Sequence, residues 1–265
     1  MRITHLTIYP IKSLAGIPLD SAKVSAQGFQ HDRRWMLTHP DGQFITARQH
    51  PRLLLMQPSF EGEHLVISAP ESSVSPLHIP LTPQRDEMVE VTIFGDQVKA
   101  QLVSEDVDAW FSERLGLSCQ LVYLHDQSRR LVDPDYAEQD DIVSFADGFP
   151  YLIIGQSSLD HLNEKLDRPL SMRRFRPNLV FEGGTPHVED EWKKIQIGPI
   201  MFLPKKPCGR CVMTTFDPDT AEQGKEPLAT LSQYRQQGRK IMFGMNLLHR
   251  GEGVVKVGDE IQVLA

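Results

Sequence analysis

Cysteine is scarce in this chain: among 265 residues there are three, Cys119, Cys208 and Cys211. So few cysteines exclude a disulfide-stapled scaffold, and we expect them to remain thiols in a reducing compartment. They also fall short of the four cysteines that bind a two-iron cluster. We therefore expect these cysteines to hold no iron–sulfur centre, so that electrons would have to come from another protein.

Long apolar runs are also missing. No stretch approaches the roughly 18 apolar residues of a transmembrane helix. The opening MRITHLTIYPIKSL lacks the apolar core and small-residue cleavage site of a signal peptide. A net charge of −7 argues against binding to nucleic acid or to an anionic membrane surface. We therefore expect a cytoplasmic protein without nucleic-acid or membrane partners.

The remaining composition is that of a globular protein: 40% of residues are hydrophobic and 24% are charged. The first half indicates β-structure, because apolar residues alternate at Ile3, Leu6 and Ile8, and turn signals occur at residues 39–42 and 95–96. Residues 105–116 predict a helix that ends at Gly116.

A polar, proline-bearing stretch at residues 123–141 reads as a linker or a loop that crosses between lobes. We place a domain boundary there, giving domains 1–122 and 123–265. After it, helices are predicted at residues 157–169, with Ser157 as N-cap, and at residues 227–238. Strands are predicted at residues 149–155, 175–183, 192–204, 211–216 and 253–264. The expected fold is mainly β with helices, an α+β fold made of barrels or sandwiches with helical decoration.

The segment PCGRCVMTTFDPDT, residues 207–220, contains two of the cysteines as a Cys-x-x-Cys pair. Such a pair can be half a zinc site, a redox dithiol, a disulfide, or one working thiolate beside a bystander. Zinc is disfavoured because Cys119 stands alone and no closely spaced histidine pair lies nearby. A thioredoxin-like dithiol needs its first cysteine at a helix N-terminus, whereas residues 211–216 predict a strand.

An inert buried cysteine is the commonest fate of an intracellular cysteine, but three features argue against it for Cys211. It follows Arg210, a cation that favours a thiolate. It lies where the loop at residues 207–210 is expected to enter a strand. A polar stretch that is unusual for a core strand follows it. Cys208 reads as a bystander.

Several segments together resemble a known family. PCGRCVMTTFDPDT, KEPLATLSQYR, FGMNLL and GVVKVGDEI are similar to the MOSC domain, named for the C-terminal domain of molybdenum cofactor sulfurases. The stretch from YPIKSLAG to HPRLLLM is similar to the β-barrel-type N-terminal domain that precedes it. The order of the motifs matches the mitochondrial amidoxime-reducing component and its bacterial relatives. The resemblance implies a MOSC-type β-barrel domain behind a β-rich N-terminal domain.

The resemblance also implies a cofactor, the molybdenum cofactor (Mo-molybdopterin). Cys211 would be the catalytic residue and the molybdenum ligand, since a soft thiolate suits a metal that is also held by sulfur. The matching cofactor-binding residues are Lys12, Ser13, Arg33, Asp147, Gly148, Phe149, Arg176, Asn178, Gly209, Arg210 and Asn246. Asn246 departs from the family, which has a tyrosine at this position.

The implied activity is reduction of small N-hydroxylated compounds, with N–O cleavage to an amine or amidine plus water. Electrons would come from a separate ferredoxin- or flavoprotein-type reductase. Asp147 is a candidate proton donor, with an ordinary loop carboxylate as the alternative interpretation. The alternative function is a molybdenum-cofactor or sulfur carrier, with a persulfide on Cys211. A plain redox dithiol is a third, and it would require Cys208.

Overall fold

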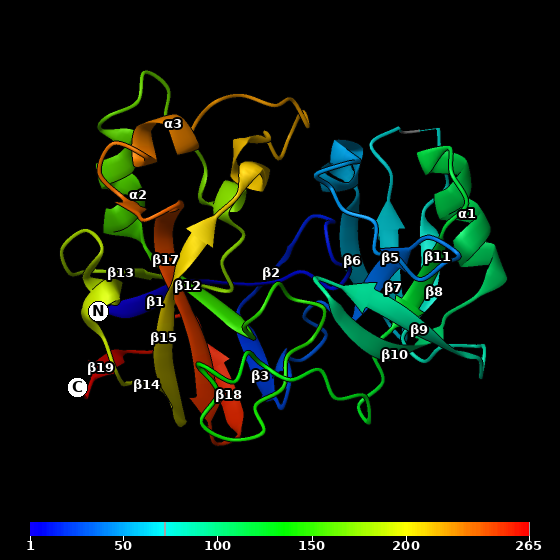
Figure 1. Cartoon of the computed structure of the whole chain (residues 1–265), viewed down its shortest axis with the longest axis horizontal. Helices are drawn as coiled ribbons and strands as arrows, with labels where there is room; N and C mark the ends of the chain where they lie inside the picture. The colour runs from blue at the N-terminus through cyan, green and yellow to red at the C-terminus, as the bar shows by residue number, and fades with distance from the viewer. Residues whose placement is uncertain (72, 265) are drawn as a thin grey trace.

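The computed structural model describes residues 1–71 and 73–264, which form two lobes made mostly of β-strands (Figure 1). This confirms the predicted fold class, mainly β with helices. Both termini lie on the large lobe, at the left of Figure 1. Within the described residues, no helix has the length and apolar character needed to span a membrane.

The large lobe contains the first four strands and all strands after residue 150. Its strands are β1 (Arg2–Ile8), β2 (Ile17–Leu19), β3 (Ser21–Ser25), β4 (Gly28–Phe29), β12 (Tyr151–Gly155), β13 (Leu179–Glu182), β14 (Ile195–Ile197), β15 (Ile200–Arg210), β16 (Gln236–Gln237), β17 (Lys240–Arg250), β18 (Gly253–Lys256) and β19 (Ile261–Val263). Its helices are α2 (Gln156–Asn163), α3 (Leu228–Leu231) and the 3₁₀ helices η2 (Met172–Phe175), η3 (Val188–Glu191) and η4 (Val212–Thr215).

The main sheet of the large lobe joins the two ends of the chain. It is nine-stranded, in the order β19-β14-β15-β17-β12-β13-β1-β2, with β16 paired to β17. Strand β1 pairs antiparallel with β13, so that Leu6 faces Leu179, and β12 and β13 pair in parallel. Strands from both halves of the chain therefore share one sheet, and the domain boundary at residue 122 stays a prediction.

The small lobe is built from the segment between β4 and β12. Its strands are β5 (Trp35–Thr38), β6 (Gln57–Glu61), β7 (His64–Ser68), β8 (Leu77–Pro80), β9 (Met88–Ile93), β10 (Asp96–Leu102) and β11 (Gln120–Tyr123), with η1 (Pro51–Leu55) and α1 (Glu105–Leu115). They form the sheets β5-β11-β10-β9 and β6-β7-β8. The predicted hairpin at residues 95–96 and the predicted helix are confirmed, and Gly116 ends α1 with φ 68°.

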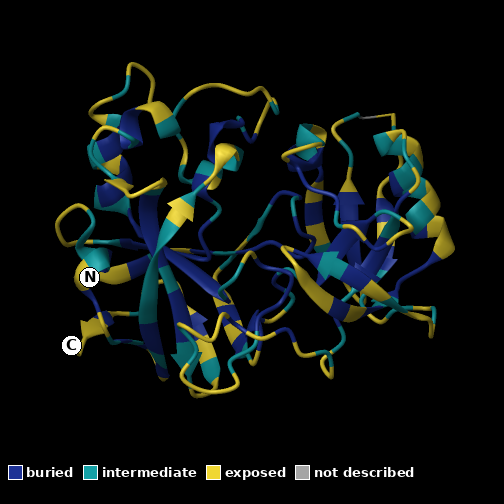
Figure 2. Ribbon diagram, viewed as in Figure 1, coloured by how far each residue is buried: buried dark blue, intermediate teal, exposed yellow. Residues whose placement is uncertain are grey.

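Each lobe has its own hydrophobic core, and Figure 2 shows the buried residues concentrated along the strands of each. Phe181 and Phe202 lie in the core of the large lobe. Trp35 and Phe111 lie in the core of the small lobe. Because apolar burial is the main stabilising term in folding, each lobe is held largely by its own core. Phe216 of the large lobe also packs into the core of the small lobe.

The predicted strand at residues 211–216 is wrong. Strand β15 instead continues through the predicted loop to Arg210, with register shifts at its prolines, and η4 follows. The reason lies in the threonines: the hydroxyls of Thr214 and Thr215 donate to the carbonyl oxygens of Cys211 (3.1 Å) and Val212 (2.7 Å). Such bonds to the residue three positions earlier favour a tight turn over an extended strand.

The two predicted helices in the second half are shorter than expected. Gly155, in extended conformation, is the N-cap of α2, and the predicted cap Ser157 lies inside the helix. Helix α2 ends at Asn163, whose side chain accepts from the backbone N–H of Leu170 at 2.8 Å and so closes the following loop. Residues 236–237, predicted helical, pair with β17 as β16.

The lowered pKa values of three histidines indicate how the stability of the folded chain depends on pH. Burial lowers the pKa of His187 to about 4, aided by Arg235 and His161, and burial also lowers the pKa values of His31 and His249. The unfolded chain then binds more protons below the ordinary histidine pKa, so stability present above about pH 6.5 is lost as the pH falls towards 4.

We expect the histidines to remove about 1 kcal/mol of the free energy of unfolding between pH 7 and pH 5. Asp108 offsets part of this loss, because burial raises its pKa to about 6 and the folded chain therefore takes up a proton there in the same pH range. Urea denaturation at the two pH values measures this. His187→Gln should flatten the dependence, whereas His64→Gln, on an exposed position of β7, should leave it unchanged. An equal pH dependence in the wild type and in His187→Gln would contradict the assignment.

Candidate functional site

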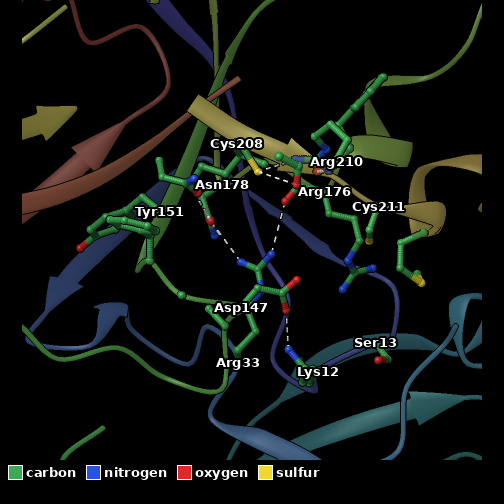
Figure 3. Close-up of a pocket in the computed structure, with 18 of the residues that line it drawn as sticks. Lys12, Ser13, Arg33, Asp147, Tyr151, Arg176, Asn178, Cys208, Arg210 and Cys211 are labelled. Atoms are coloured by element: carbon green, nitrogen blue, oxygen red, sulfur yellow. Dashed lines mark hydrogen bonds and ion pairs between the residues drawn. The ribbon is translucent and has the colours of Figure 1, made fainter. Parts of the chain in front are cut away.

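Every residue that the family resemblance assigned to the cofactor site lines a single cavity between the lobes (Figure 3). They come from both halves of the chain: Lys12, Ser13, Arg33, Asp147, Gly148, Phe149, Arg176, Asn178, Gly209, Arg210, Cys211 and Asn246. The structure thus brings the predicted residues together. What each of them contacts in a bound ligand stays a prediction.

Loops and strand ends supply most of this lining, as expected where a rigid scaffold positions functional groups. Residues 12–13 follow β1, and residue 33 precedes β5. Residues 147–149 precede β12, and residues 176–178 connect η2 to β13. Residues 209–211 end β15 and lead into η4, and residue 246 lies on the neighbouring β17.

Lys12 and Asp147 form an ion pair in the cavity. The Lys12 side chain is buried, and its Nζ donates to Oδ1 of Asp147 at 2.6 Å and to the carbonyl oxygen of Phe145 at 2.9 Å. Burial lowers the pKa of Lys12, and Asp147 partly restores it. Desolvation raises the pKa of Asp147, but Lys12 outweighs it, with help from Arg48 and Arg33, and holds this pKa well below its usual range. Asp147 is therefore a carboxylate at neutral pH, which argues against the proton-donor role considered for it.

Arg33 is held in place by three partners. Its Nη1 donates to Oδ2 of Asp32 at 2.7 Å and to Oδ1 of Asn178 at 3.1 Å, and its Nη2 donates to the carbonyl oxygen of Arg176 at 3.3 Å. Asn178 is 2% exposed, and its Nδ2 donates to the carbonyl oxygen of Thr7. Asn178 thus ties Arg33 to the sheet, and a direct contact between Asn178 and a ligand stays a prediction.

The guanidinium of Arg176 has no anionic partner among the residues that the structure describes. Among the ion pairs and side-chain hydrogen bonds of residues 1–71 and 73–264, none is made by this group. Desolvation lowers the pKa of Arg176 to about 10, and Arg33 adds to the effect, so the side chain is still charged at neutral pH. Arg176 is half-buried in the cavity, and an anionic ligand would stabilise a partly desolvated cation that the described residues leave unpaired.

Backbone conformation is strained at the same place. Ser13, Arg33 and Arg176 have φ angles of 78°, 49° and 55°, in the left-handed region that residues with a side chain seldom adopt. Such conformations cost of order 1–3 kcal/mol each and cluster at functional sites. All three line the cavity.

The two neighbouring cysteines have different surroundings. Cys211 is exposed at the start of η4, whereas Cys208 is half-buried and packs against a hydrophobic cluster. Both are free thiols. Arg210 was expected beside the sulfur of Cys211, but its Nη1 donates to Sγ of Cys208 at 3.0 Å and its Nη2 to the carbonyl oxygen of Phe175 at 2.6 Å. The cation therefore contacts the bystander sulfur.

Sequence reasoning missed several lining residues, among them Arg48 and Arg174. Arg174 donates to Oδ2 of Asp217 at 2.6 Å and to the carbonyl oxygen of Thr215 at 3.2 Å. This contact fixes the segment after Cys211 against η2 and explains its polar sequence. The sequence feature that could have revealed Arg174 is a basic segment, MRRFR, together with an acidic segment, DPD, to which it can pair.

The cavity is strongly basic in a chain that carries a net charge of −7. Among the described lining residues, Asp147 is the single acidic one, against Lys12, Arg33, Arg176 and the other lining arginines. Clefts lined by one sign of charge concentrate ligands of the opposite sign. The geometry thus suits an anionic ligand that also reaches the exposed thiol of Cys211.

Comparison with protein families and curated proteins gives two kinds of match. The family profile described as "MOSC N-terminal beta barrel domain" matches residues 1–118, and that of the MOSC domain matches residues 140–262. The mitochondrial amidoxime-reducing component 1 of Mus musculus is 32% identical, over 99% of this chain and 82% of that protein. Its Homo sapiens counterpart is also 32% identical, over the same shares. The molybdenum cofactor sulfurase of Oryza sativa subsp. japonica is 31% identical, over 99% of this chain and 35% of that protein.

Proposed function

This chain belongs to the family of MOSC-domain proteins that includes the mitochondrial amidoxime-reducing components, and from that membership we propose that it is a molybdenum-cofactor-dependent reductase of N-hydroxylated compounds. The reaction would consume two electrons and two protons, cleave the N–O bond, and release an amine or amidine and water. The observation that carries the proposal is the basic cavity in which the unpaired guanidinium of Arg176 and the exposed thiol of Cys211 lie together.

The residues in the cavity fit such a cofactor. A pterin with a phosphate needs cations and hydrogen-bond donors, and arginine offers phosphate a flat bidentate fork. Arg176 has that fork free, and Nε of Arg210 is buried without a hydrogen-bond partner among the described residues. We propose that Lys12, Arg33 and Arg176 hold the phosphate and that Cys211 ligates the metal with its sulfur. When bound, the cofactor would supply the two electrons for N–O cleavage.

The chain's own groups would orient the cofactor and leave room for the substrate. Asp32 and Asn178 fix the guanidinium of Arg33, and Asp147 fixes the ammonium of Lys12. The exposed position of Cys211 leaves its side of the cavity open to a small substrate and to water. Because Asp147 is ionised, we propose that the two protons reach the substrate from solvent.

Turnover of a model amidoxime tests the proposed activity directly. With three cysteines, the chain is short of the ligands for an iron–sulfur cluster, so we propose that a separate ferredoxin- or flavoprotein-type reductase supplies its electrons. The cofactor-loaded protein should reduce benzamidoxime to benzamidine with reduced methyl viologen, but not with NADPH alone. Absence of turnover with methyl viologen in molybdenum-loaded protein would contradict the reductase assignment.

A second candidate function is a molybdenum-cofactor or sulfur carrier. The exposed thiol of Cys211 favours it, because a sulfur that is handed on must be accessible. The similarity to a molybdenum cofactor sulfurase along nearly the whole chain also supports it. A carrier would transfer the cofactor or a persulfide sulfur to an acceptor protein and would show no amidoxime turnover, so the same assay distinguishes the two functions.

A further inference from the structure

Two like-charged groups of the cavity share one aromatic ring. The guanidinium carbons of Arg33 and Arg176 each lie 4.2 Å from the centroid of the Tyr9 ring. A guanidinium over a tyrosine ring is attracted by the negative charge of the ring face, more strongly when the pair is desolvated. For Arg176 this ring is the principal contact, because the described residues offer its guanidinium no hydrogen-bond acceptor.

The Tyr9 ring is itself held on several sides. Its side chain is 4% exposed, its backbone N–H donates to Oδ1 of Asp32 at 2.8 Å, and its hydroxyl donates to the carbonyl oxygen of Pro177 at 3.1 Å. Gly16 leaves space for the ring, since a Cβ at this position would lie 2.6 Å from Cε1 of Tyr9. The ring is therefore a fixed platform.

We propose that Tyr9 is a positioning residue that sets Arg33 and Arg176 in place for an anionic phosphate group. Without the ring, the two guanidiniums would repel each other and move towards solvent or carboxylates. Asp32 accepts hydrogen bonds from the backbone N–H of Tyr9 and from the guanidinium of Arg33, so it ties Arg33 to the segment that carries the ring. This inference rests on the proposed function only in assigning the cavity to a phosphate-bearing ligand.

The test compares Tyr9→Leu with Tyr9→Phe in the full chain. Isothermal titration with inorganic phosphate gives a dissociation constant without any need for turnover. Tyr9→Leu should raise that constant by about threefold to thirtyfold, the range expected for losing a desolvated cation–π contact. Tyr9→Phe should stay within about twofold, because it keeps the aromatic ring that both guanidiniums contact.

A matched control separates positioning from stability. Arg34 lies 5.0 Å from the ring centroid of Tyr123, which is outside the cavity. Tyr123→Leu should lower the melting temperature without changing phosphate affinity. If Tyr9→Leu does not fold, Gly16→Ala provides the second test, because its Cβ would displace the ring and should also weaken phosphate binding.

Two outcomes would overturn the inference. Equal phosphate affinity in the wild type and in folded Tyr9→Leu, or in Gly16→Ala, would show that the ring has only a structural role, while the proposed cofactor site would stand. A wild-type protein that binds no phosphate and carries no pterin would remove both the inference and the proposed site.

Discussion

Cys211→Ser is expected to abolish amidoxime reduction, lowering turnover by about a hundredfold or more, since changes even one shell away from a metal cost 10–100-fold. Serine offers a harder oxygen, a poor partner for a metal that prefers sulfur. Pterin should still bind, because the cations proposed to hold its phosphate lie elsewhere in the cavity.

Cys208→Ser is the matched control, and it should retain most of the activity. Cys208 is half-buried, and its sulfur accepts a hydrogen bond from Arg210, which a serine oxygen can also accept. A redox dithiol would instead require both sulfurs to close a disulfide. Turnover and molybdenum content, measured for both variants, distinguish a single metal-binding sulfur from a redox dithiol. Equal loss of activity in the two variants would contradict a single working sulfur.

The second large effect is expected at Arg176. Arg176→Ala should lower cofactor occupancy about tenfold or more, because a charge-assisted bidentate contact contributes about 1.5–3 kcal/mol. Arg173, three residues earlier, is the matched control. It forms an ion pair with Asp219 at 2.7 Å, and both side chains are exposed. Exposed pairs contribute about 0–1 kcal/mol to stability, so Arg173→Ala should leave occupancy unchanged.

Molybdenum and pterin content per folded chain measure this prediction. If Arg176→Ala keeps the wild-type molybdenum and pterin content, Arg176 does not contact the cofactor and the proposed phosphate contact is wrong. If both variants lose cofactor equally, the general positive charge of this segment matters and the particular geometry of Arg176 does not.

Local sequence patterns correctly predicted those strands, turns and helices that are determined by residues close together in the chain. The alternation at the start of β1, the hairpin at residues 95–96 and the helix ending at Gly116 each depend on neighbouring residues, and each is present. The pairing of β1 with β13 joins residues far apart in the chain, and alternation says nothing about which strand lies alongside.

The segment after Cys211 shows how a β-like composition can mislead. Val212, Thr214 and Thr215 favour a strand by type. The threonine hydroxyls instead bond back to main-chain carbonyls and stabilise a 3₁₀ turn, an outcome that propensity does not weigh.

The gathering of the cavity residues was predicted by family resemblance and could not be reached from periodicity. Individually, Lys12, Arg33 and Arg176 read as ordinary surface charges. Their proposed role depends on contacts between residues far apart in the chain. Examples are the ion pair of Lys12 with Asp147 and the contacts of the Tyr9 ring with two guanidiniums. Such contacts depend on the tertiary structure, so no local pattern reveals them.

Binding of the cofactor is tested by the molybdenum and pterin content of the wild-type chain purified from a host that makes the molybdenum cofactor. We expect about one molybdenum per chain, with pterin in equal amount, because one soft sulfur ligand, that of Cys211, lies exposed in the basic cavity. A folded preparation from such a host that contains neither the metal nor pterin fluorescence would contradict it.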